Sequence, residues 1–476
     1  MLLPFCNLRL TVGTRCWYHV HVMLRVAYHT LGCKVNQYET EKTREALEGA
    51  GFETVGFHSR ADVYIINTCS VTGVADGKSR AAIRRALRTN PEAYVVVAGC
   101  YAELEPAQVS AMEGVDLVVP NSEKDGIAER IIARFGGQGA ASRAVARPRS
   151  RTRAVVKVQD GCDQFCAYCV IPYARVGKTS WPMAEVLDEL RSLAGFGYKE
   201  IVLTGIRLGS YEDGSSRLPE LTLAAAEVDG IERVRLSSVE PWEVDDSLLA
   251  AMTHPKVCRH LHIPLQSGDD RTLARMDRPY TTAEFAGIMS RVRERIPGVG
   301  ITTDIIVGFP GETAVEFAGT LDFARDAAFS RLHVFRYSPR DRTRAAAMPD
   351  QVDSETKKAR AERLIEVGSE AVRGFARSSV GERLMVLAER EVVSAPAGPA
   401  SAASHRSNRT ALGPFGTGFG SKPPKQQTEV EAKHLTGFAD NYVEVVFAGD
   451  ASLRGEIVPV RVTSVDDNGR AVGYAE

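Results

Sequence analysis

The stretch AVVKVQDGCDQFCAYC, residues 154–169, joins a valine-rich apolar run to three closely spaced cysteines. A short apolar run of this kind is typical of a buried strand in a parallel sheet. The loop that follows holds Cys162, Cys166 and Cys169 with the spacing C-x-x-x-C-x-x-C. In parallel α/β proteins the functional loops follow the carboxyl ends of the strands, so we expect this loop to form a site.

Downstream of this loop, further apolar runs alternate with helical patterns such as MAEVLDELRSLAGFG at residues 183–197. Six strands in such a series predict a parallel β/α barrel, complete or partial, over residues 154–375. The five later runs are EIVLTG at 200–205, RVRLSS at 233–238, HLHIPL at 260–265, GITTDIIVGF at 300–309 and LHVFRYS at 332–338.

Upstream, residues 23–140 contain a second series of apolar runs, each followed by a polar segment with helical spacing, which predicts a doubly wound α/β domain. Three cysteines occupy the same place in successive units: Cys33 follows LRVAYHTLG, Cys69 follows DVYIINT, and Cys100 follows AYVVVAG. Because the carboxyl ends of parallel strands line one crevice, these cysteines are expected to converge into a site of three thiolates. The fold class is therefore α/β.

Residues 376–476 change in character. GERLMVLAERE, NYVEVVFAG, RGEIVPVRVTSV and GRAVGYAE are short alternating strands joined by Gly, Asp and Asn turns, which predicts a small antiparallel barrel. An insertion at residues 394–428 is rich in Ala, Gly, Ser and Pro and is expected to be disordered. Residues 141–153 form a linker that is rich in arginine.

The composition excludes several classes of protein. Among 476 residues, 59 Lys and Arg balance 60 Asp and Glu, so a globally basic nucleic-acid coat is excluded and any basic surface is local. No apolar run approaches the ~20 residues of a membrane span, so we expect no membrane association. Residues 1–22 lack the features of a signal peptide and are expected to be a disordered extension or an upstream start-site artefact. Nine cysteines, six of them in two trios, favour a reducing compartment, the cytoplasm.

The trio Cys162, Cys166 and Cys169 indicates an iron-sulfur cluster with one iron that lacks a protein ligand, because such clusters usually take four cysteines. An open coordination position is where a metal site binds a reactant. A structural zinc site is the alternative, but it needs a fourth Cys or His, and VIPYARVGK at residues 170–178 supplies none.

This sequence resembles the radical S-adenosylmethionine methylthiotransferases over nearly everything from Met23 to the end. The resemblance rests on eight motifs in a fixed order, one of which contains CDQFCAYC. They are TLGCKVNQYETE at 30–41, NTCSVT at 67–72, AGCYAEL at 98–104, QDGCDQFCAYCVIPYAR at 159–175, LTGIRLGSY at 203–211, RLSSVEP at 235–241, HLHIPLQSG at 260–268 and DIIVGFPGET at 304–313.

The resemblance implies an amino-terminal methylthiotransferase domain, a radical barrel and a carboxyl-terminal TRAM domain that binds RNA. It also implies two four-iron (4Fe-4S) clusters. Cys162, Cys166 and Cys169 would hold the cluster that cleaves S-adenosylmethionine, and Cys33, Cys69 and Cys100 the auxiliary cluster that delivers sulfur. The remaining implied residues belong to the S-adenosylmethionine pocket: Tyr168, Thr204, Gly205, Ser238, Glu240, Gln266, Gly308 and Gly311.

The implied substrate is an adenosine beside the tRNA anticodon. An aromatic adenine C–H bond is beyond any side-chain acid or base near neutral pH, so a radical is required. Two molecules of S-adenosylmethionine would be used per product, one for the radical and one for the methyl group. An electron donor and a sulfur donor of unknown identity are also implied.

The motifs look most like the branch that adds methylthio to carbon two of N6-threonylcarbamoyladenosine. Sister branches act on isopentenyladenosine in tRNA and on an aspartate of a ribosomal protein, and a non-catalytic RNA-binding protein is a more distant alternative. Two departures from the family pattern affect substrate contacts: the loop after Arg175 reads VGKTSW rather than glycine with an Arg-Ser-Arg-like stretch, and the last domain carries the insertion. Arginines at helical spacing near Cys69 are candidate phosphate contacts: Arg80, Arg84, Arg85 and Arg88.

Overall fold

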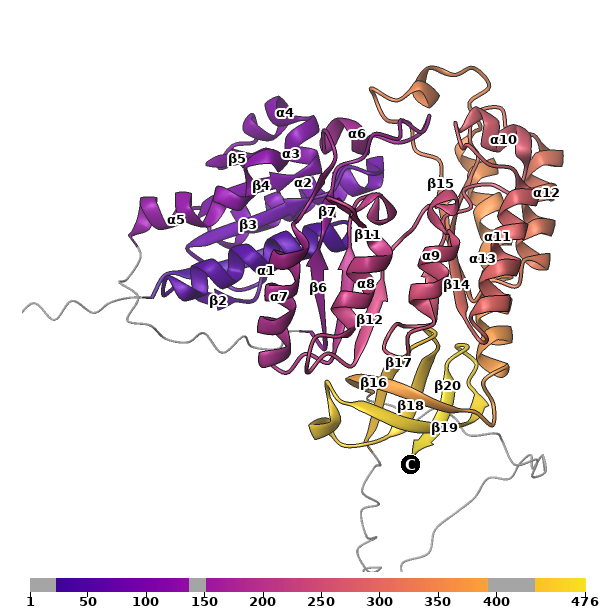
Figure 1. The fold of residues 1–476 in the computed structure, drawn as a ribbon. Helices are drawn as coiled ribbons and strands as arrows, with labels where there is room; N and C mark the ends of the chain where they lie inside the picture. Colours follow the sequence, from indigo (N-terminus) through magenta and orange to yellow (C-terminus); the bar gives the residue numbers. More distant parts are fainter. Residues whose placement is uncertain (1–22, 137–150, 393–432) are drawn as a thin grey trace, which may run out of the picture.

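The computed structural model describes residues 23–136, 151–392 and 433–476, and Figure 1 shows three bodies in chain order. The expectations for residues 1–22, for the insertion at 394–428 and for most of the linker lie outside the described residues. Arg153, expected in the linker, is instead the first residue of strand β6 (Arg153–Lys157).

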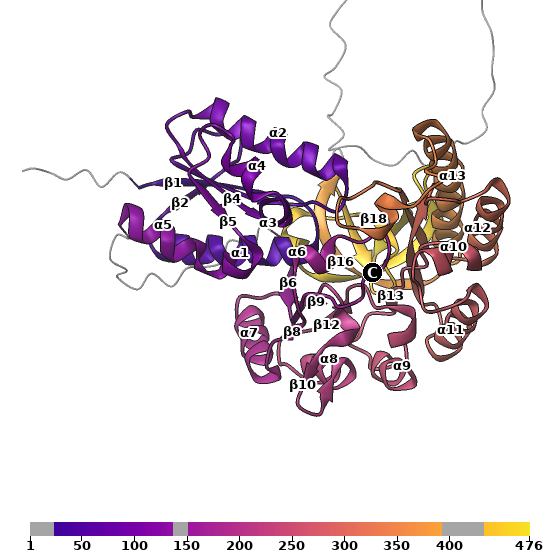
Figure 2. The same cartoon turned by 90° about the horizontal axis from the view of Figure 1, so that it is seen from above.

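The amino-terminal domain is a parallel sheet, as the alternating pattern predicts, and it has five strands in the order β2-β1-β3-β4-β5. Its strands are apolar because helices cover both faces. Figure 2 shows α2 on one face of the sheet and α1 and α5 on the other. Ile83 of α2 packs with Ile66 and Val97, and Ile131 of α5 packs with Ile65. The elements are β1 (Arg25–Thr30), α1 (Lys34–Gly49), β2 (Glu53–Val55), β3 (Val63–Thr68), α2 (Gly73–Thr89), β4 (Tyr94–Gly99), α3 (Cys100–Leu104), α4 (Pro106–Ser110), β5 (Leu117–Val119), the 3-10 helix η1 (Asn121–Gly126) and α5 (Ile127–Phe135).

The central domain is a partial barrel of six parallel strands. Two three-stranded sheets, β6-β9-β12 and β13-β14-β15, meet through isolated bridges such as Ser238 to His262. Within the described residues no strand pairing joins β6 to β15, so the barrel is open on that side. The strands are β6, β9 (Glu200–Thr204), β12 (Arg233–Leu236), β13 (His260–His262), β14 (Gly300–Val307) and β15 (Arg331–Arg336).

Helices cover the outside of this barrel. Residues that alternate along the strands, such as Val156 and Leu203, pack outward against helical residues such as Leu190 and Leu221. The remaining elements are β7 (Gln159–Asp160), α6 (Ile171–Ala174), β8 (Thr179–Ser180), α7 (Met183–Gly195), η2 (Leu208–Ser210), β10 (Glu212–Asp213), β11 (Ser216–Arg217), α8 (Leu218–Ala226), η3 (Pro241–Glu243), α9 (Asp246–Met252), α10 (Asp270–Arg275), α11 (Thr282–Arg295), α12 (Ala314–Asp326) and η4 (Arg344–Ala347).

The carboxyl-terminal domain is a closed barrel of order β16-β17-β18-β20-β19, which confirms the expected small barrel. It is not wholly antiparallel as expected, because β18 and β20 pair in parallel while the other four pairs are antiparallel. The sequence pattern missed β17 (His434–Ala439), which follows the insertion in the sequence. Helix α13 (Ser354–Arg377) leads into the barrel and crosses the predicted boundary at residue 376. The other elements are β16 (Arg383–Val392), β18 (Glu444–Ala448), η5 (Ala451–Leu453), β19 (Ile457–Val465) and β20 (Ala471–Ala475).

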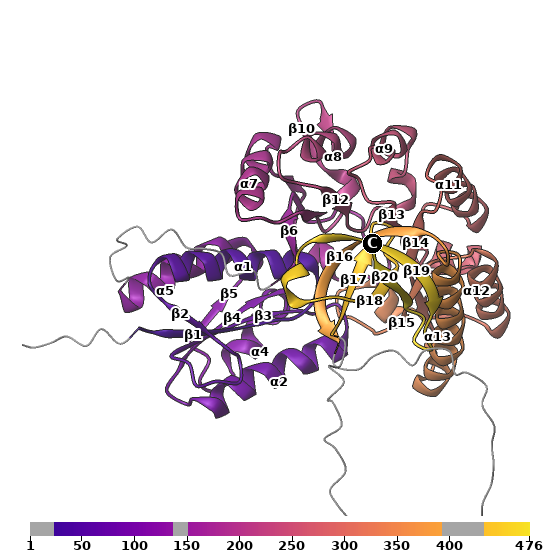
Figure 3. The ribbon, with the colours of Figure 1, turned by 90° about the horizontal axis from the view of Figure 1, so that it is seen from below.

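This small barrel closes the lower end of the central barrel, as Figure 3 shows from below. The turn between β17 and β18 enters that end, where the Tyr442 ring stacks on His260 at a centroid distance of 4.5 Å. Arg235 donates to the carbonyl oxygens of Ala439 (3.1 Å) and Asp440 (3.0 Å). Its Nε also donates to the fully buried carboxylate of Glu200 at 2.8 Å. The two domains therefore share a buried, charged interface.

None of the helices in the described part of the chain is both long and apolar enough to cross a membrane.

Candidate active site

The loop after β6 and β7 carries the first cysteine trio at the upper end of the central barrel. Gly161 begins it at φ +74°, and a Cβ there would lie 1.6 Å from the carbonyl oxygen of Gly177, so only glycine fits. The backbone N–H of Gln164 donates to the Cys162 thiol at 3.3 Å. The N–H of Cys169 donates to the carbonyl oxygen of Cys166 at 3.0 Å, which folds the three cysteines into one compact loop.

Arg278 reaches this loop from the other half of the barrel. Its guanidinium donates to the Cys166 sulfur at 3.4 Å and forms an ion pair with Glu240, which is partly exposed. Glu240, expected in the cofactor pocket, is thus joined to the trio through an arginine that the sequence analysis missed. In the sequence, Arg278 is recognisable only as an arginine in a loop between two barrel strands. Other arginines occupy such loops, so its contact with the cysteine trio could not be predicted.

The second trio lies at the carboxyl ends of β1, β3 and β4, which are neighbours in the sheet. Cys33 caps the amino-terminal end of α1, Cys69 directly follows β3, and Cys100 begins α3. A Cβ on Gly32 would lie 3.0 Å from the Cys69 sulfur, so the loop before Cys33 passes against Cys69. The structure therefore brings together the three cysteines that the strand pattern placed at one sheet edge.

Burial keeps most of these thiols protonated in the absence of a cation. It raises the pKa of Cys69 to about 11, and the neighbouring thiols of Cys100 and Cys33 add to the rise. In the first trio, burial raises the pKa of Cys169 to about 12 and also raises the pKa of Cys162. A bound metal centre reverses this preference because it deprotonates the thiols that it binds.

The donor sets fit iron-sulfur clusters. Within the described ranges no three His, Cys, Asp or Glu side chains converge on a single ion. In a cluster, however, each cysteine binds a different iron, so the three sulfur atoms need not converge on one point. Each donor set consists of three thiols, without a histidine or carboxylate among them. Such sets suit two clusters better than two single ions.

The two trios border the same short segment. Helix α6 begins two residues after Cys169, and its neighbour Val170 packs with Ala174 against Cys100 in one buried cluster. A cavity of about 180 Å³ is lined by Cys169 and by Val71 and Thr72. Val71 and Thr72 belong to the loop that follows Cys69. One cavity thus reaches from the first trio to the loop that carries a cysteine of the second.

Two of the eight expected cofactor-pocket residues line this cavity. Tyr168 and Gln266 both contribute to its wall, together with Asp304. Gln266 has φ +66°, and its N–H and carbonyl oxygen bond with Asp304 and Ile306 of β14, which fixes its position beside the cavity. Burial raises the pKa of the Tyr168 hydroxyl well above its ordinary value, so this ring stays neutral.

The other expected pocket residues lie outside the cavity wall. Thr204 ends β9, and a Cβ on Gly205 would lie 2.8 Å from Oε1 of Gln159, so this turn packs against the strand before the first trio. Ser238 is exposed beside β13. Gly308 and Gly311 both have positive φ and form a turn in which the Gly308 N–H donates to Glu312 at 2.7 Å. Their assignment to the cofactor stays a prediction.

Inside the barrel, two histidines flank Asp304. Nε2 of His262 lies 3.3 Å from Oδ1 of Asp304, and Nδ1 of His333 lies 3.8 Å from the same oxygen. Thr302 bonds to both His262 and His260, at 2.9 and 3.1 Å. The middle of the barrel is therefore polar, unlike the apolar, closely packed interior of a complete β/α barrel.

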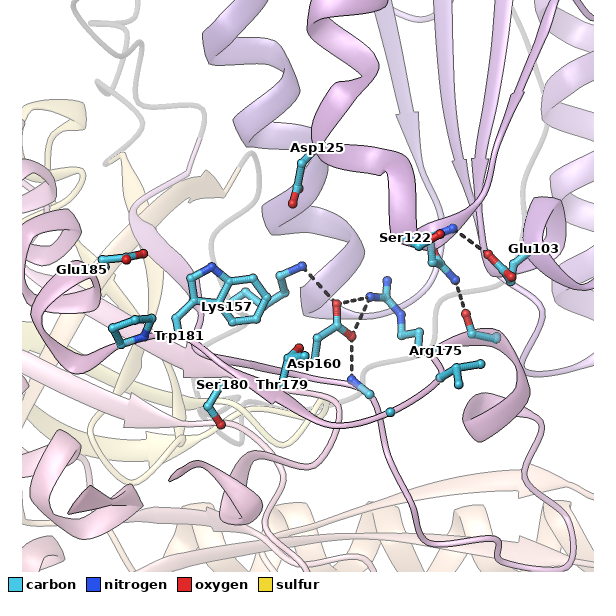
Figure 4. A pocket seen from close by; sticks show the side chains of 16 residues that line it. Glu103, Ser122, Asp125, Lys157, Asp160, Arg175, Thr179, Ser180, Trp181 and Glu185 are labelled. Atoms are coloured by element: carbon cyan, nitrogen blue, oxygen red, sulfur yellow. Dashed lines mark hydrogen bonds and ion pairs between the residues drawn. The ribbon is translucent and has the colours of Figure 1, made fainter. Parts of the chain in front are cut away.

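The divergent loop after Arg175 lines a second, larger cavity of about 600 Å³ between the amino-terminal domain and the barrel (Figure 4). Thr179 and Ser180 form β8 and pair with β7, which fixes the loop beside the first trio. Trp181 lies over Lys157, with the ammonium 4.6 Å from a ring centroid. The loop is thus part of a domain junction rather than a wall of the smaller cavity.

A basic cleft of about 370 Å³ lies where all three domains meet. Its cations come from each domain, and Glu389 is its only carboxylate among the lining residues described. The basic residues are Lys34, Arg151, Arg153, Arg390 and Arg454. By contrast, Arg84, Arg85 and Arg88 are exposed on α2 outside this cleft, and Arg80 donates to the Tyr101 hydroxyl at 3.2 Å.

Comparisons with known proteins agree with this architecture. The uncharacterized protein family UPF0004 matches residues 25–120, and the radical SAM superfamily matches residues 156–324. The radical S-adenosylmethionine methyltransferase TsrM from Kitasatospora setae aligns with a TM-score of 0.51 at 16% identity, over 68% of this chain and 77% of its own. At that identity the likeness shows a shared fold alone.

Relatives of higher identity cover almost the whole chain. The threonylcarbamoyladenosine tRNA methylthiotransferase MtaB of Bacillus subtilis (strain 168) is 38% identical over 460 residues, which are 92% of this chain and 94% of that protein. The MtaB of Thermotoga maritima is 38% identical over 77% of this chain and 87% of its own. The tRNA-2-methylthio-N(6)-dimethylallyladenosine synthase of Acetivibrio thermocellus is 34% identical over 92% of this chain and 88% of its own.

The radical SAM match implies one four-iron cluster and S-adenosylmethionine as cofactors. Taken with these relatives and with the two cysteine trios, it shows that the chain belongs to the radical S-adenosylmethionine methylthiotransferases.

Proposed function

We propose that this enzyme adds a methylthio group to carbon two of N6-threonylcarbamoyladenosine beside the anticodon of tRNA. The observation that carries the proposal is the 38% identity to two relatives named for that reaction, at 92% and 77% coverage of this chain. Relatives named for dimethylallyladenosine are 33–36% identical, which favours the same chemistry on a different adenosine as the second candidate.

We assign the two trios to two different clusters. Cys162, Cys166 and Cys169 would hold the four-iron cluster that the radical SAM family uses, and Cys33, Cys69 and Cys100 a second, auxiliary cluster. When bound, these groups supply the radical that attacks an unactivated C–H bond and the sulfur that replaces the hydrogen. Two molecules of S-adenosylmethionine per product, an external electron donor and an external sulfur donor belong to this proposal.

The chain's own residues have three tasks in this scheme. Arg278 joins Cys166 to Glu240, and its N–H group donates to the ligand sulfur at 3.4 Å. Gln266 and Asp304 present polar groups from β14 and its neighbouring loop to whatever enters that cavity. The amino-terminal domain covers part of this cavity, because Val71 and Thr72 after Cys69 contribute to its wall.

We further propose that the basic cleft binds the phosphate backbone of the RNA. A cleft with five cations and one carboxylate suits a polyanion, and its cations belong to all three domains. Arg390 and Arg454 of the small barrel are exposed and available for such contacts. This agrees with the expected role of that domain in RNA binding.

The RNA contact is tested with the apoprotein and an anticodon stem-loop. Binding by Arg390→Gln and by Arg454→Gln is measured at several salt concentrations, with Arg325→Gln on α12 as the matched control. The plot of log K against log salt has a negative slope, and each lost phosphate contact should make that slope shallower by about 0.7. Unchanged slopes in both cleft variants would contradict the proposal.

The substrate is tested with the reconstituted enzyme and three stem-loops, which carry threonylcarbamoyladenosine, isopentenyladenosine or unmodified adenosine. We expect a methylthio product, identified by mass spectrometry of the nucleosides, from the first alone. Product from the isopentenyl stem-loop instead would support the second candidate. If enzyme with full cluster content forms no methylthio nucleoside from any of the stem-loops, both tRNA candidates are contradicted. The ribosomal-protein aspartate would then be tested as the substrate.

The reaction needs reduced cysteines, so we expect it to take place in the cytoplasm. All seven cysteines in the described part of the chain are free thiols. Cell fractionation with an antibody to the chain tests this expectation.

A further inference from the structure

A buried network of charges joins the amino-terminal domain to the barrel, and Arg175 is its centre. The Arg175 guanidinium donates to Glu39 at 2.9 Å and to both carboxylate oxygens of Asp160 at 2.8 Å. Lys124 donates to the other oxygen of Glu39 at 2.6 Å, and Lys157 bridges Glu39 and Asp160 at 3.1 Å each. Figure 4 shows Lys157, Asp160 and Arg175 side by side at the base of the larger cavity.

The network is more than a surface ion pair. Glu39, Lys124, Lys157 and Arg175 are each at most 6% exposed. Groups this deeply buried lose most of their hydration, and only close, well-directed partners offset that loss. Because Glu39 and Lys124 come from one domain and the others from the barrel, the network also fixes how the two domains face each other.

The same network lies against the auxiliary trio. Glu39 is on α1, whose amino-terminal end is capped by Cys33, and Arg175 directly follows α6, which packs against Cys100. Arg175 interacts electrostatically with the thiols of both Cys33 and Cys100, and Lys124 interacts in the same way with Cys100. Asn121 completes the contact, because its amide lies 3.8 Å from the Cys100 sulfur and 2.6 Å from the carbonyl oxygen of Ala174.

The charges of the network do not cancel. Three basic side chains, Lys124, Lys157 and Arg175, face two carboxylates, Glu39 and Asp160, so the network carries one excess positive charge when all five groups are ionised. Burial lowers the pKa of Lys124, and its ion pair with Glu39 opposes that shift. A four-iron cluster in its oxidised state, held by three thiolates, has one net negative charge, and reduction or an added anionic sulfur ligand makes it more negative. The excess positive charge of the network is therefore opposite in sign to the charge that the auxiliary cluster would carry.

We infer that the Arg175 network is the counter-charge of the auxiliary cluster and that it favours the more negative states of that site. This inference rests on the two-cluster assignment made above. Net charge and nearby charged groups are among the factors that set the potential of an iron-sulfur cluster. Loss of a cation from the network should therefore lower the reduction potential of the auxiliary cluster, and loss of a carboxylate should raise it.

A purely structural role in domain docking is the competing explanation. Under that explanation, every variant that breaks the network loosens the interface, and none moves the potential in a direction set by the sign of the lost charge. Opposite shifts from opposite charges separate the two explanations.

The experiment isolates the auxiliary cluster in full-length protein that carries Cys162→Ala, Cys166→Ala and Cys169→Ala. After anaerobic reconstitution, its midpoint potential is measured by redox titration with electron paramagnetic resonance detection. Arg175→Gln and Asp160→Asn are introduced into this background, with Glu39→Gln as a second carboxylate variant and Arg175→Lys as the variant that keeps the charge. Arg235→Gln is the matched control, because Arg235 is equally buried at a domain interface that contains no cluster cysteine.

We expect Arg175→Gln to shift the balance of oxidised and reduced cluster at least tenfold toward the oxidised form, about 59 mV for one electron. Asp160→Asn and Glu39→Gln should shift it in the opposite direction, while Arg175→Lys and Arg235→Gln should leave it within a factor of two. Equal potentials in all folded variants, or shifts of one sign throughout, would overturn the inference. Failure of the background protein to form any four-iron cluster would instead overturn the two-cluster assignment.

Discussion

Gly99 allows Cys100 to reach the auxiliary site, and replacing it with alanine should disable that site alone. Gly99 has φ +100° and ψ −172°, a conformation that is essentially restricted to glycine and costs other residues about 1–3 kcal/mol. A Cβ there would also lie 2.4 Å from the carbonyl oxygen and 2.6 Å from the nitrogen of Thr68. Because those atoms belong to the paired strand β3, they cannot move aside without breaking the ladder between β3 and β4.

The two effects together give a destabilisation of about 3 kcal/mol or more around Cys100. We expect Gly99→Ala to bind about four irons per chain rather than about eight, to retain reductive cleavage of S-adenosylmethionine and to form no methylthio product. Iron analysis, 5′-deoxyadenosine formation and nucleoside mass spectrometry are the measurements. Gly77→Ala is the control, because Gly77 lies in α2 with open space around it and should be stabilised by about 0.5–1 kcal/mol. Full iron content and normal product in Gly99→Ala would refute the reasoning.

Three further perturbations have expected outcomes. Arg278→Gln removes a charged donor from the Cys166 sulfur, so the potential of the first cluster should fall by at least 59 mV, as redox titration would show. Burial alone would raise the pKa of Glu200, but Arg235 and Arg153 outweigh it and hold the pKa below its ordinary value. The stabilisation from Glu200 is therefore present above pH ~4.5 and lost as the pH falls through its lowered pKa, so urea unfolding between pH 7 and 3 should show a steeper acid loss for wild type than for Glu200→Gln. Tyr442→Ala removes the ring stacked on His260, should cost about 3–5 kcal/mol at the interface, and should separate the melting of the small barrel from that of the rest in calorimetry.

Much of the fold follows from short-range patterns in the sequence. The apolar runs that lead to Cys33, Cys69 and Cys100 end at neighbouring positions of one parallel sheet, because consecutive β-α units place their strands side by side. The sequence missed β2 and β17 for local reasons. β2 has only three residues and is partly exposed, and β17 contains Gly437, whose missing side chain lets the Leu387 backbone approach closely.

The site was predictable only where its residues are close in sequence or repeat a pattern. Arg278 and Cys166 are 112 positions apart, and Arg175 and Glu39 are 136 apart, so no spacing rule links them. The turn at Tyr442 closes the lower end of the barrel and contacts Arg235. These two parts of the chain are more than 200 residues apart in the sequence. Such contacts depend on how the domains pack, and local propensity carries no information about that packing.

The division of labour between the two trios is tested most directly by three single-cysteine variants assayed for iron and for 5′-deoxyadenosine. Cys258→Ala is the control, since Cys258 is a buried cysteine outside both trios. We expect about eight irons per chain in the control and about four in both Cys69→Ala and Cys169→Ala. Cleavage of S-adenosylmethionine should persist in Cys69→Ala without methylthio product and should be absent in Cys169→Ala. Equal loss of cleavage in the two variants, with both folded, would contradict the account.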